Sequence, residues 1–521
     1  MATTEQFIQA AQQGYTFKGE SFRLGVGMYD KEVVKGAEVL LPLKTMNRHG
    51  LIAGATGTGK TKTLQVIAEG LSDASIPVVL MDIKGDLSGI AAAGASNPKI
   101  EERIQLMGGE YKASAFPVEL MTLSDDKKGV RLRATVSEFG PILLSKILGL
   151  NDTQQGIVAM IFKFCDDNKM PLLDLKDFIK IIQYISDEGK STIEKNYGKI
   201  STSSTGTILR KVIELQQQGA DAFFGEPSFE VDDLMRISDD GRGMISILRL
   251  MELQDRPKLF STFMLSLLAE LYATLPEEGD MDKPKLVLFI DEAHLVFQEA
   301  NEALLQQIET VIKLIRSKGV GIFFCTQNPQ DVPASVLAQL GLKVQHALRA
   351  FTAADRKVIK QAAENYPETE YYDVDELLTQ LGIGEAFITL LNEKGIPTPL
   401  VHTMLVAPRS RMDVLSDNEV DSLVTKSKLV KKYAENIDSE SAHEIITAKL
   451  EEAAEKTKAA EEARAEEKEE KKRPAKKEET FFDNPTVKQV GRTAASIITR
   501  SLLGALGLGG RTTRRKKTGW F

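Results

Sequence analysis

Short runs of consecutive apolar residues alternate along this chain with segments in which apolar residues recur every three or four positions. The run at residues 49–54 is followed by a helical pattern at residues 60–71, and a second run covers residues 78–83. The same alternation returns near the middle of the chain, at residues 284–290, 302–318 and 319–326. Continuous apolar runs predict buried strands, whereas spacings of three and four predict amphipathic helices. The alternation therefore predicts an α/β fold with a doubly wound, mostly parallel sheet.

The pattern changes over a long central segment and again after about residue 410. The central segment is mainly helical in pattern, with one candidate strand in the sequence GMISILRL, and we interpret it as an insertion between two strands. Near the C-terminus Glu, Lys and Ala dominate, which predicts a solvated helix. The predicted segments are a small N-terminal β cap (1–45), the first part of the core (46–95), the mainly helical insertion (96–270), the second part of the core (271–410), C-terminal helices (411–443), a charged helical linker (444–482) and a basic amphipathic tail (483–521).

The composition is typical of soluble globular proteins and indicates the cellular compartment in which we expect the protein. The chain has 521 residues, of which 42% are hydrophobic and 27% are charged, and its net charge is −8. This acidic balance argues against a basic surface over the whole molecule, although it leaves room for a local basic lining. Cys165 and Cys325 lie in apolar surroundings, which indicates a reducing compartment. With no signal-peptide pattern and no run of about 18 apolar residues, we expect a cytoplasmic protein without a transmembrane segment.

The sequence GATGTGKT, between the first predicted strand and its helix, has the G-x-x-x-x-G-K-[ST] spacing of a phosphate-binding loop. In such loops backbone N–H groups surround the phosphates, and the positive end of the following helix adds to the attraction. Lys60 would contact the β- and γ-phosphates, and the Thr61 hydroxyl would bind Mg²⁺. The predicted cofactors are therefore ATP and Mg²⁺, and the predicted loop residues are Gly54, Ala55, Thr56, Gly57, Thr58, Gly59, Lys60, Thr61 and Lys62.

Two acidic residues, Asp291 and Glu292, follow the apolar run LVLFI. An aspartate at the end of a strand beside the loop strand would hold the metal ion, so Asp291 is the second candidate metal ligand. The adjacent Glu292 would polarise or position the attacking water and is the candidate general base. Without a neighbouring phosphate loop, the same pair would read as two solvent-facing acids at the end of a strand.

Five further polar positions are candidates for roles at the γ-phosphate, at the metal-bound water or between subunits. Gln327 ends the apolar run GIFFCT, where a polar side chain would sense the γ-phosphate or orient water. Arg316 ends the preceding helix; it would either reach the phosphates of a neighbouring subunit or complement its own helix dipole. Arg349 is a second candidate arginine. Asp82 and Lys84, at the end of another predicted strand, would orient the metal-bound water or contact the next subunit.

Several of these sequences together resemble the HerA/FtsK superfamily. They are RHGLIAGATGTGKTKTLQ, VVLMDIKGDLSG, LFIDEAHLVF, LIRSKGVGIFFCTQNPQDVPASVLAQLGLKVQHALRAFT and LGIGEAFITLL, and the resemblance is nearest to the bacterial HerA-like helicases over residues 20–410. The resemblance implies a RecA-like P-loop core in a homo-oligomeric, hexameric ring, with Arg316 reaching into the neighbour's site and Gln327 as the polar sensor. Archetypal HerA proteins carry an N-terminal β-barrel longer than the 45 residues here, so the resemblance leaves the partner protein open.

Relatives in this superfamily move DNA or protein, which gives two functional hypotheses. The first is a helicase-like motor that uses Mg²⁺-dependent ATP hydrolysis to translocate on double-stranded DNA. The second is an ATPase of the secretion type that moves or assembles protein, or a scaffold whose nucleotide state controls a protein partner. The basic amphipathic tail would pack on the ring or on a partner; a peripheral contact with a membrane is the less favoured interpretation.

Overall fold

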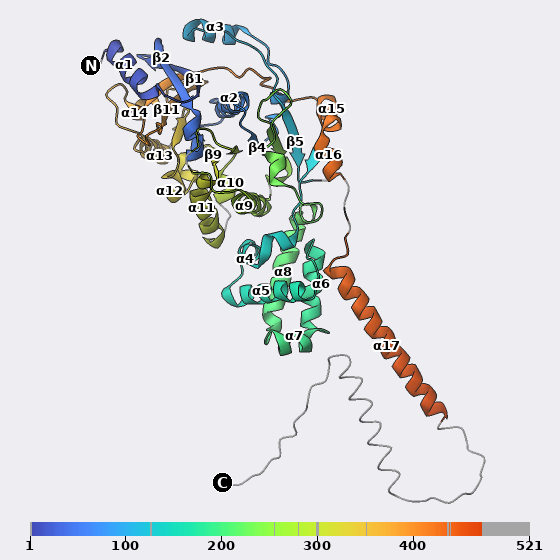
Figure 1. Cartoon of the computed structure of the whole chain (residues 1–521). Helices are drawn as coiled ribbons and strands as arrows, with labels where there is room; N and C mark the ends of the chain where they lie inside the picture. Colours follow the sequence, from blue (N-terminus) through green and yellow to red (C-terminus); the bar gives the residue numbers. More distant parts are fainter. Residues whose placement is uncertain are drawn as a thin grey trace, which may run out of the picture. The chain divides into compact units, whose positions relative to one another are not determined.

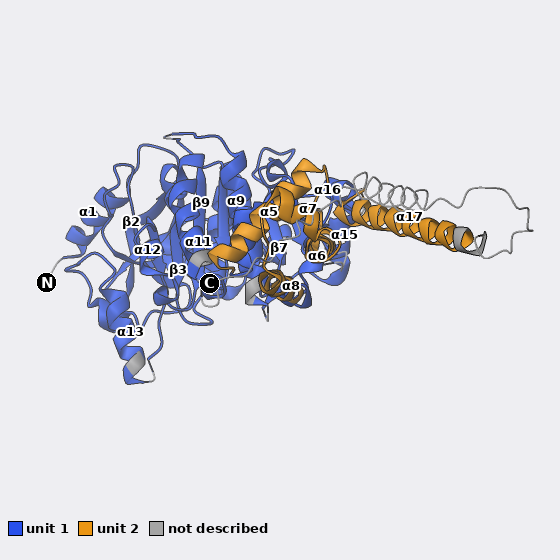
Figure 2. Cartoon of the chain, turned by 90° about the horizontal axis from the view of Figure 1, so that it is seen from below, with its two compact units in different colours: residues 1–149, 214–438 blue, residues 150–213, 439–521 orange. Residues whose placement is uncertain are grey.

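The computed structural model describes residues 3–124, 128–254, 256–279, 281–297, 302–350, 352–434, 437 and 439–470. The chain forms two compact units, both built from separate stretches of sequence (Figure 2). Unit 1 comprises residues 1–149 and 214–438, and unit 2 comprises residues 150–213 and 439–521. The predicted basic tail at residues 483–521, and the last part of the predicted charged linker, lie outside the described residues.

Unit 1 is built on one sheet, to which β1, β4, β5, β9 and β11 of Figure 1 belong. Within the described residues this sheet has twelve strands, in the order β2-β1-β12-β11-β10-β3-β9-β8-β4-β7-β5-β6. Every neighbouring pair from β10 to β6 is parallel, and every pair from β10 to β2 is antiparallel. This confirms the predicted α/β class with a mostly parallel sheet. The strands are β1 Ser21–Tyr29, β2 Glu32–Pro42, β3 Gly50–Ala53, β4 Val78–Asp82, β5 Val118–Thr122, β6 Val130–Arg131, β7 Ile245–Arg249, β8 Leu286–Ile290, β9 Val320–Thr326, β10 Leu342–Gln345, β11 Glu385–Leu390 and β12 Val401–Leu405.

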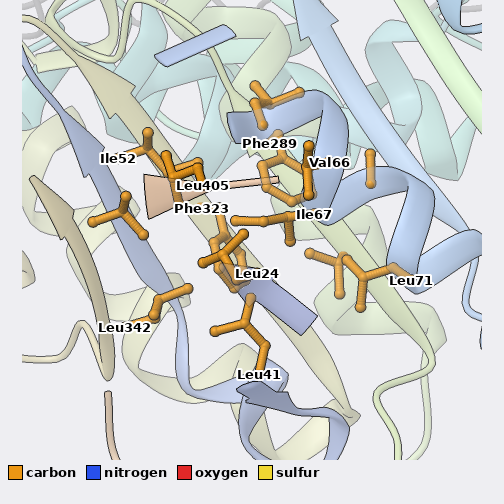
Figure 3. Close-up of a cluster of buried hydrophobic side chains, with 14 of the residues drawn as sticks. Leu24, Leu41, Ile52, Val66, Ile67, Leu71, Phe289, Phe323, Leu342 and Leu405 are labelled. Atoms are coloured by element: carbon orange, nitrogen blue, oxygen red, sulfur yellow. The ribbon is translucent and has the colours of Figure 1, made fainter. Parts of the chain in front are cut away.

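The central strands are covered by helices on both faces, as their continuous apolar sequences require. On one face, Val66, Ile67 and Leu71 of α2 are buried in the same apolar cluster as Phe323 (Figure 3). Phe324, the next residue along β9, packs against Phe297 of α10 with ring centroids 5.5 Å apart. Because successive strand residues point to opposite faces, α10 covers the face opposite α2.

Among the other helices of unit 1, α9 and α11 pack against each other. Unit 1 contains α1 Thr4–Tyr15, α2 Lys60–Asp73, α3 Pro98–Met107, α4 Val136–Ile147, α9 Pro257–Thr274, α10 His294–Phe297, α11 Glu302–Ile315, α12 Ala334–Leu337, α13 Ala353–Ala363, α14 Val374–Leu377, α15 Asp417–Lys426 and α16 Lys428–Tyr433.

Unit 2 is helical and joins two parts of the chain that are far apart in sequence. Its helices are α5 Asp152–Asp167, α6 Leu175–Ser186, α7 Lys190–Asn196, most of α8 Thr202–Gln217, and α17 Ala442–Glu470. The start of α17 packs on α6, where the Asp177 carboxylate accepts hydrogen bonds from the Ser441 hydroxyl and from the backbone N–H of His443. Nearly every residue from 451 to 466 is exposed, so this part of the Glu/Lys-rich run is a solvated helix.

Two segments are arranged differently from the simplest interpretation of their sequence. The N-terminal residues form α1 and a hairpin, β1–β2, which extends the main sheet because β1 pairs with β12. The segment 96–270 contributes β5, β6 and β7 to the same sheet, and its separate helical part covers residues 150–213. None of the described helices is long and apolar enough to cross a membrane.

Candidate functional site

The glycine-rich loop lies between β3 and α2, in the middle of the sheet. β3 is flanked by β10 and β9, and the loop is fixed to both neighbours: Gly54 N–H donates to Thr326 O and Ala55 N–H donates to Ala347 O, at 3.2 and 2.8 Å. Gly54 and Gly57 have φ angles of +152° and +80°. Glycine adopts such angles without the penalty that a side chain would bring. The sequence therefore forms a sharply folded loop held rigidly at the carboxyl edge of the sheet.

Lys60 opens α2 and is buried, and its ammonium folds back over the loop. Its Nζ donates to Gly54 O at 2.6 Å and to Ala55 O at 3.1 Å. Burial lowers the pKa of Lys60; Lys84 lowers it as well, while Glu292 and Asp291 raise it. The lysine therefore belongs to one electrostatic cluster with the two acids that follow β8.

The N-terminal end of α2 has the features of an anion site. Gly59 precedes the helix, and no described side chain caps it, so the first N–H groups of α2 are free of side-chain partners. Added to the positive end of the helix dipole, these donors attract phosphate. The partly exposed Thr61 follows Lys60 on this first turn. Lys62, in contrast, points away from the loop: its Nζ donates to Met412 O and to the Gln65 side chain.

Asp291 and Glu292 lie directly after β8, at the same carboxyl edge as the loop. Only β9 separates β8 from β3. Burial raises the pKa of Asp291 to about 7, against the opposing effect of Lys84. Glu292 forms an ion pair with Lys84, and His294 Nδ1 lies 3.1 Å from the other Glu292 oxygen. Glu292 has a positive φ of 49°, an unusual angle for a non-glycine residue that often accompanies a functional constraint.

The residues present fit ATP with Mg²⁺. Asp291 Oδ2 is buried, and within the described residues nothing donates a hydrogen bond to it, which suits an oxygen that would face a cation. Asp291 and the Thr61 hydroxyl would hold the metal ion, which when bound neutralises charge on the phosphates. Lys60 and the loop N–H groups would bind the phosphates, and the Glu292 carboxylate, which is paired with Lys84, would accept a proton from water.

Asp82 and Lys84, which were predicted at the end of a strand near the loop, have different roles in the fold. Asp82 accepts hydrogen bonds from the backbone N–H groups of Gly85 and Leu87, at 2.6 and 3.1 Å, and from that of Asp86 at 3.2 Å. It therefore fixes the turn after β4. Lys84 extends from this turn to Glu292, because β4 is the neighbour of β8.

Gln327, Arg316 and Arg349 are exposed, and the sheet places them at different distances from the loop. Gln327 follows β9, which lies between the loop strand and the strand of the two acids, so Gln327 is at the same carboxyl edge as the loop. Arg349 follows β10 at the same edge. Arg316 lies before β9, whose seven residues span roughly 20 Å, and is therefore at the opposite edge of the sheet. Arg316 cannot reach the loop of its own chain.

Sequence reasoning missed His346, which supports the loop from β10. Its ring Nε2 is 2.9 Å from the Thr63 hydroxyl of α2, and its Cβ lies against Gly54. Burial lowers the pKa of His346 to about 4, so the ring is neutral near pH 7. No motif marked this residue, although its position directly after an apolar strand beside the loop strand was a usable signal.

Comparison with known proteins agrees with this fold. The profile of the helicase HerA-like C-terminal family matches residues 30–514. The DNA double-strand break repair helicase HerA of Saccharolobus solfataricus is 22% identical over 360 residues, which cover 68% of this chain and 64% of that protein. The protein of the same name from Sulfurisphaera tokodaii is 21% identical over 397 residues, or 74% of this chain and 69% of that protein. The matches thus span about two thirds of these relatives.

A solved structure of low sequence identity shares the fold. The bacterial conjugative coupling protein TrwBdeltaN70, in its unbound monoclinic form, superposes with a TM-score of 0.51 at 14% identity. The superposition covers 78% of this chain and 94% of the other. The glycine-rich loop and the mostly parallel sheet agree with the family profile, and this chain belongs to the helicase HerA-like C-terminal family.

Proposed function

We propose that this protein is a subunit of a ring-shaped motor that couples Mg²⁺-dependent ATP hydrolysis to movement along double-stranded DNA. In this proposal Lys60 and the loop bind the phosphates, Asp291 and Thr61 hold the metal ion, and Glu292 activates water. Gln327 senses the γ-phosphate. Arg316 acts on the nucleotide of the neighbouring subunit.

The observation that carries the proposal is the separation of Arg316 from its own loop. Lys60, Asp291 and Glu292 meet at one edge of the sheet, whereas Arg316 is exposed at the other edge. A guanidinium that stabilises charge on the transferred phosphoryl group can be supplied by a second molecule. An exposed arginine on the far edge therefore supports an assembly in which subunits complete one another's sites. The relatives named DNA double-strand break repair helicase support DNA as the polymer that is moved.

The first test is the steady-state rate of ATP hydrolysis, measured at low salt with and without linear duplex DNA. Glu292→Gln provides the blank, because it keeps the side-chain shape but removes the base. We expect DNA to stimulate hydrolysis and the stimulation to fall steeply as salt rises, since binding to phosphates releases counterions. Hydrolysis that depends on Glu292 but ignores duplex DNA at every salt concentration would refute the DNA part of the proposal and favour a protein-directed ATPase.

A further inference from the structure

The Glu292 carboxylate faces a nitrogen group at each of its two oxygens. Oε1 forms an ion pair with the Lys84 ammonium, and Oε2 lies 3.1 Å from His294 Nδ1. The Glu292 side chain is 7% exposed, so it has little room to turn. An oxygen that accepts a proton from water has to face that water molecule. The carboxylate is therefore held by its neighbours in an arrangement that it must partly leave before it can act as a base.

The ion pair with Lys84 also opposes the proton transfer itself. An ammonium group in contact with a carboxylate stabilises the charged form of the carboxylate over its protonated form. A general base becomes protonated as it activates water, so this contact works against the reaction. Glu292 is therefore the weakest base while the pair is intact, and it becomes a stronger base when the ammonium moves away.

Lys84 has a second acidic neighbour in its own turn. Asp86 follows two residues later, and its Oδ1 atom is buried. Nothing in the part of the chain that the structure describes donates a hydrogen bond to this oxygen. Burial lowers the pKa of the lysine, but Glu292, Asp291 and Asp86 together raise it above its ordinary value. The ammonium is thus within electrostatic reach of the Asp86 carboxylate as well as of Glu292.

Lys62 is the other lysine whose ammonium lies within electrostatic reach of Asp86, and it is engaged elsewhere. Its Nζ donates to Met412 O and to the Gln65 side chain. The buried oxygen of Asp86 is therefore left as an acceptor for Lys84.

The backbone that carries Lys84 is fixed, so a change of partner involves the side chain alone. Asp82 accepts three backbone N–H groups of the turn, and Gln254 Nε2 donates to Ile83 O at 2.7 Å. The Lys84 side chain is 36% exposed, and a lysine ends in a compact charge on a flexible four-carbon stem. It can exchange one carboxylate for another without any movement of the sheet.

We propose that Lys84 is a positioning residue that restrains Glu292. Its ammonium holds the carboxylate while the two are paired, and transfer of the ammonium to Asp86 frees the carboxylate to accept a proton from water. This inference rests on the proposed function, because it takes Glu292 to be the base. It makes the exchange of Lys84 between two carboxylates a step of each turnover.

The test is the steady-state hydrolysis of ATP by the full-length chain, with Mg²⁺ and without DNA. Lys84→Met keeps most of the stem but removes the charge, and it should raise kcat at least about threefold while KM for ATP stays unchanged. Asp86→Asn should lower kcat, because the ammonium then stays on Glu292. In the double variant Asp86→Asn should have no further effect, since the lysine on which it acts is missing.

Lys128→Met is the matched control. The Lys128 side chain is 31% exposed and pairs with Asp417 at 2.8 Å, so the variant also breaks an ion pair of a partly exposed lysine. Its kcat should equal that of the wild type. A kcat that falls in Lys84→Met and is restored in Lys84→Arg would overturn the inference, because Lys84 would then assist the base. An unchanged kcat in Lys84→Met would overturn it too, as would an effect of Asp86→Asn that persists in the double variant.

Glu292→Gln separates this inference from the proposed function. If Glu292→Gln is inactive while Lys84→Met turns over like the wild type, only the present inference fails. If Glu292→Gln hydrolyses ATP at the rate of the wild type, or if the wild type does not hydrolyse ATP, the proposed function fails and the inference fails with it. Thermal unfolding and calorimetric binding of ATP show for each variant that it is folded and still binds the nucleotide.

Discussion

Alanine at Gly54 should destabilise the phosphate loop far more than alanine at Gly57. A Cβ at Gly54 would lie 2.5 Å from His346 Cβ, whereas a Cβ at Gly57 would have no heavy atom within 4 Å. Both positions have positive φ, and holding alanine in such a conformation costs about 1–2 kcal/mol at either site. Only Gly54→Ala adds a steric overlap, and forcing an extra carbon into a packed site costs about 1–3 kcal/mol.

The difference between the two variants is therefore about 2 kcal/mol of local stability, with Gly57→Ala as the matched control. We expect it to appear in native-state hydrogen exchange of the peptide that covers residues 50–73, measured without nucleotide. The same overlap should displace the His346 ring and loosen its bond to Thr63, so exchange in the first turn of α2 should rise most. Free energies of exchange that agree within about 0.5 kcal/mol for the two variants would refute the packing argument.

Three further predictions concern the chemistry and the pH dependence. Glu292→Gln should lower ATP hydrolysis by about a hundredfold or more while ATP binding, measured by calorimetry, stays near that of the wild type; normal turnover would exclude Glu292 as the base. Arg316→Ala should not hydrolyse ATP when it is the only subunit present. Mixing it with Glu292→Gln should restore part of the hydrolysis, because some interfaces then pair an intact Arg316 with an intact Glu292. If hydrolysis does not recover after subunit exchange, the sites are not shared between subunits. Burial lowers the pKa of His49 to about 4 from 6.5, and its Nδ1 accepts from Ile322 N–H. Between pH 6.5 and 4 the unfolded chain therefore binds a proton at His49 that the folded chain does not, so the free energy of unfolding falls as the pH falls. In His49→Gln this proton is missing. The slope of the free energy of unfolding against pH, measured by urea titrations, should therefore be smaller by about 1.4 kcal/mol per pH unit than in the wild type.

The sequence predicted those parts of the site that depend on short stretches of chain. The loop at residues 54–62 could be found because its strand, glycines and helix follow one another directly. Asp291 and Glu292 could be found because an apolar run ends at them. The support given by His346 and Lys84 depends on strand order, since β10 neighbours β3 and β4 neighbours β8 only in the folded sheet. No local pattern encodes that order.

The sequence did not predict that the central segment is divided between the sheet and a separate helical unit, and the physical reason is related. β5 and β6 have five and two residues, and their flanks are polar or helical in pattern. Strands this short give little periodic signal, and their place near the edge of the sheet is set by the pairing of β5 with β7 and of β6 with β5. The helical unit at residues 150–213 shares the amphipathic spacing of the helices in unit 1, so spacing alone could not separate it.

The discontinuous construction of unit 2 has a consequence for synthesis of the protein on the ribosome. Helices α5, α6 and α7 emerge early, but the Ser441 hydroxyl that bonds Asp177 is 264 residues further along the chain. Asp177 is buried beside it, and burial raises the pKa of its carboxyl group. A nascent chain would hold an apolar surface on α6 exposed until the last strands of the sheet have been translated. The helical unit can therefore close only after every described strand of the sheet has been translated, because β12 ends before Ser441.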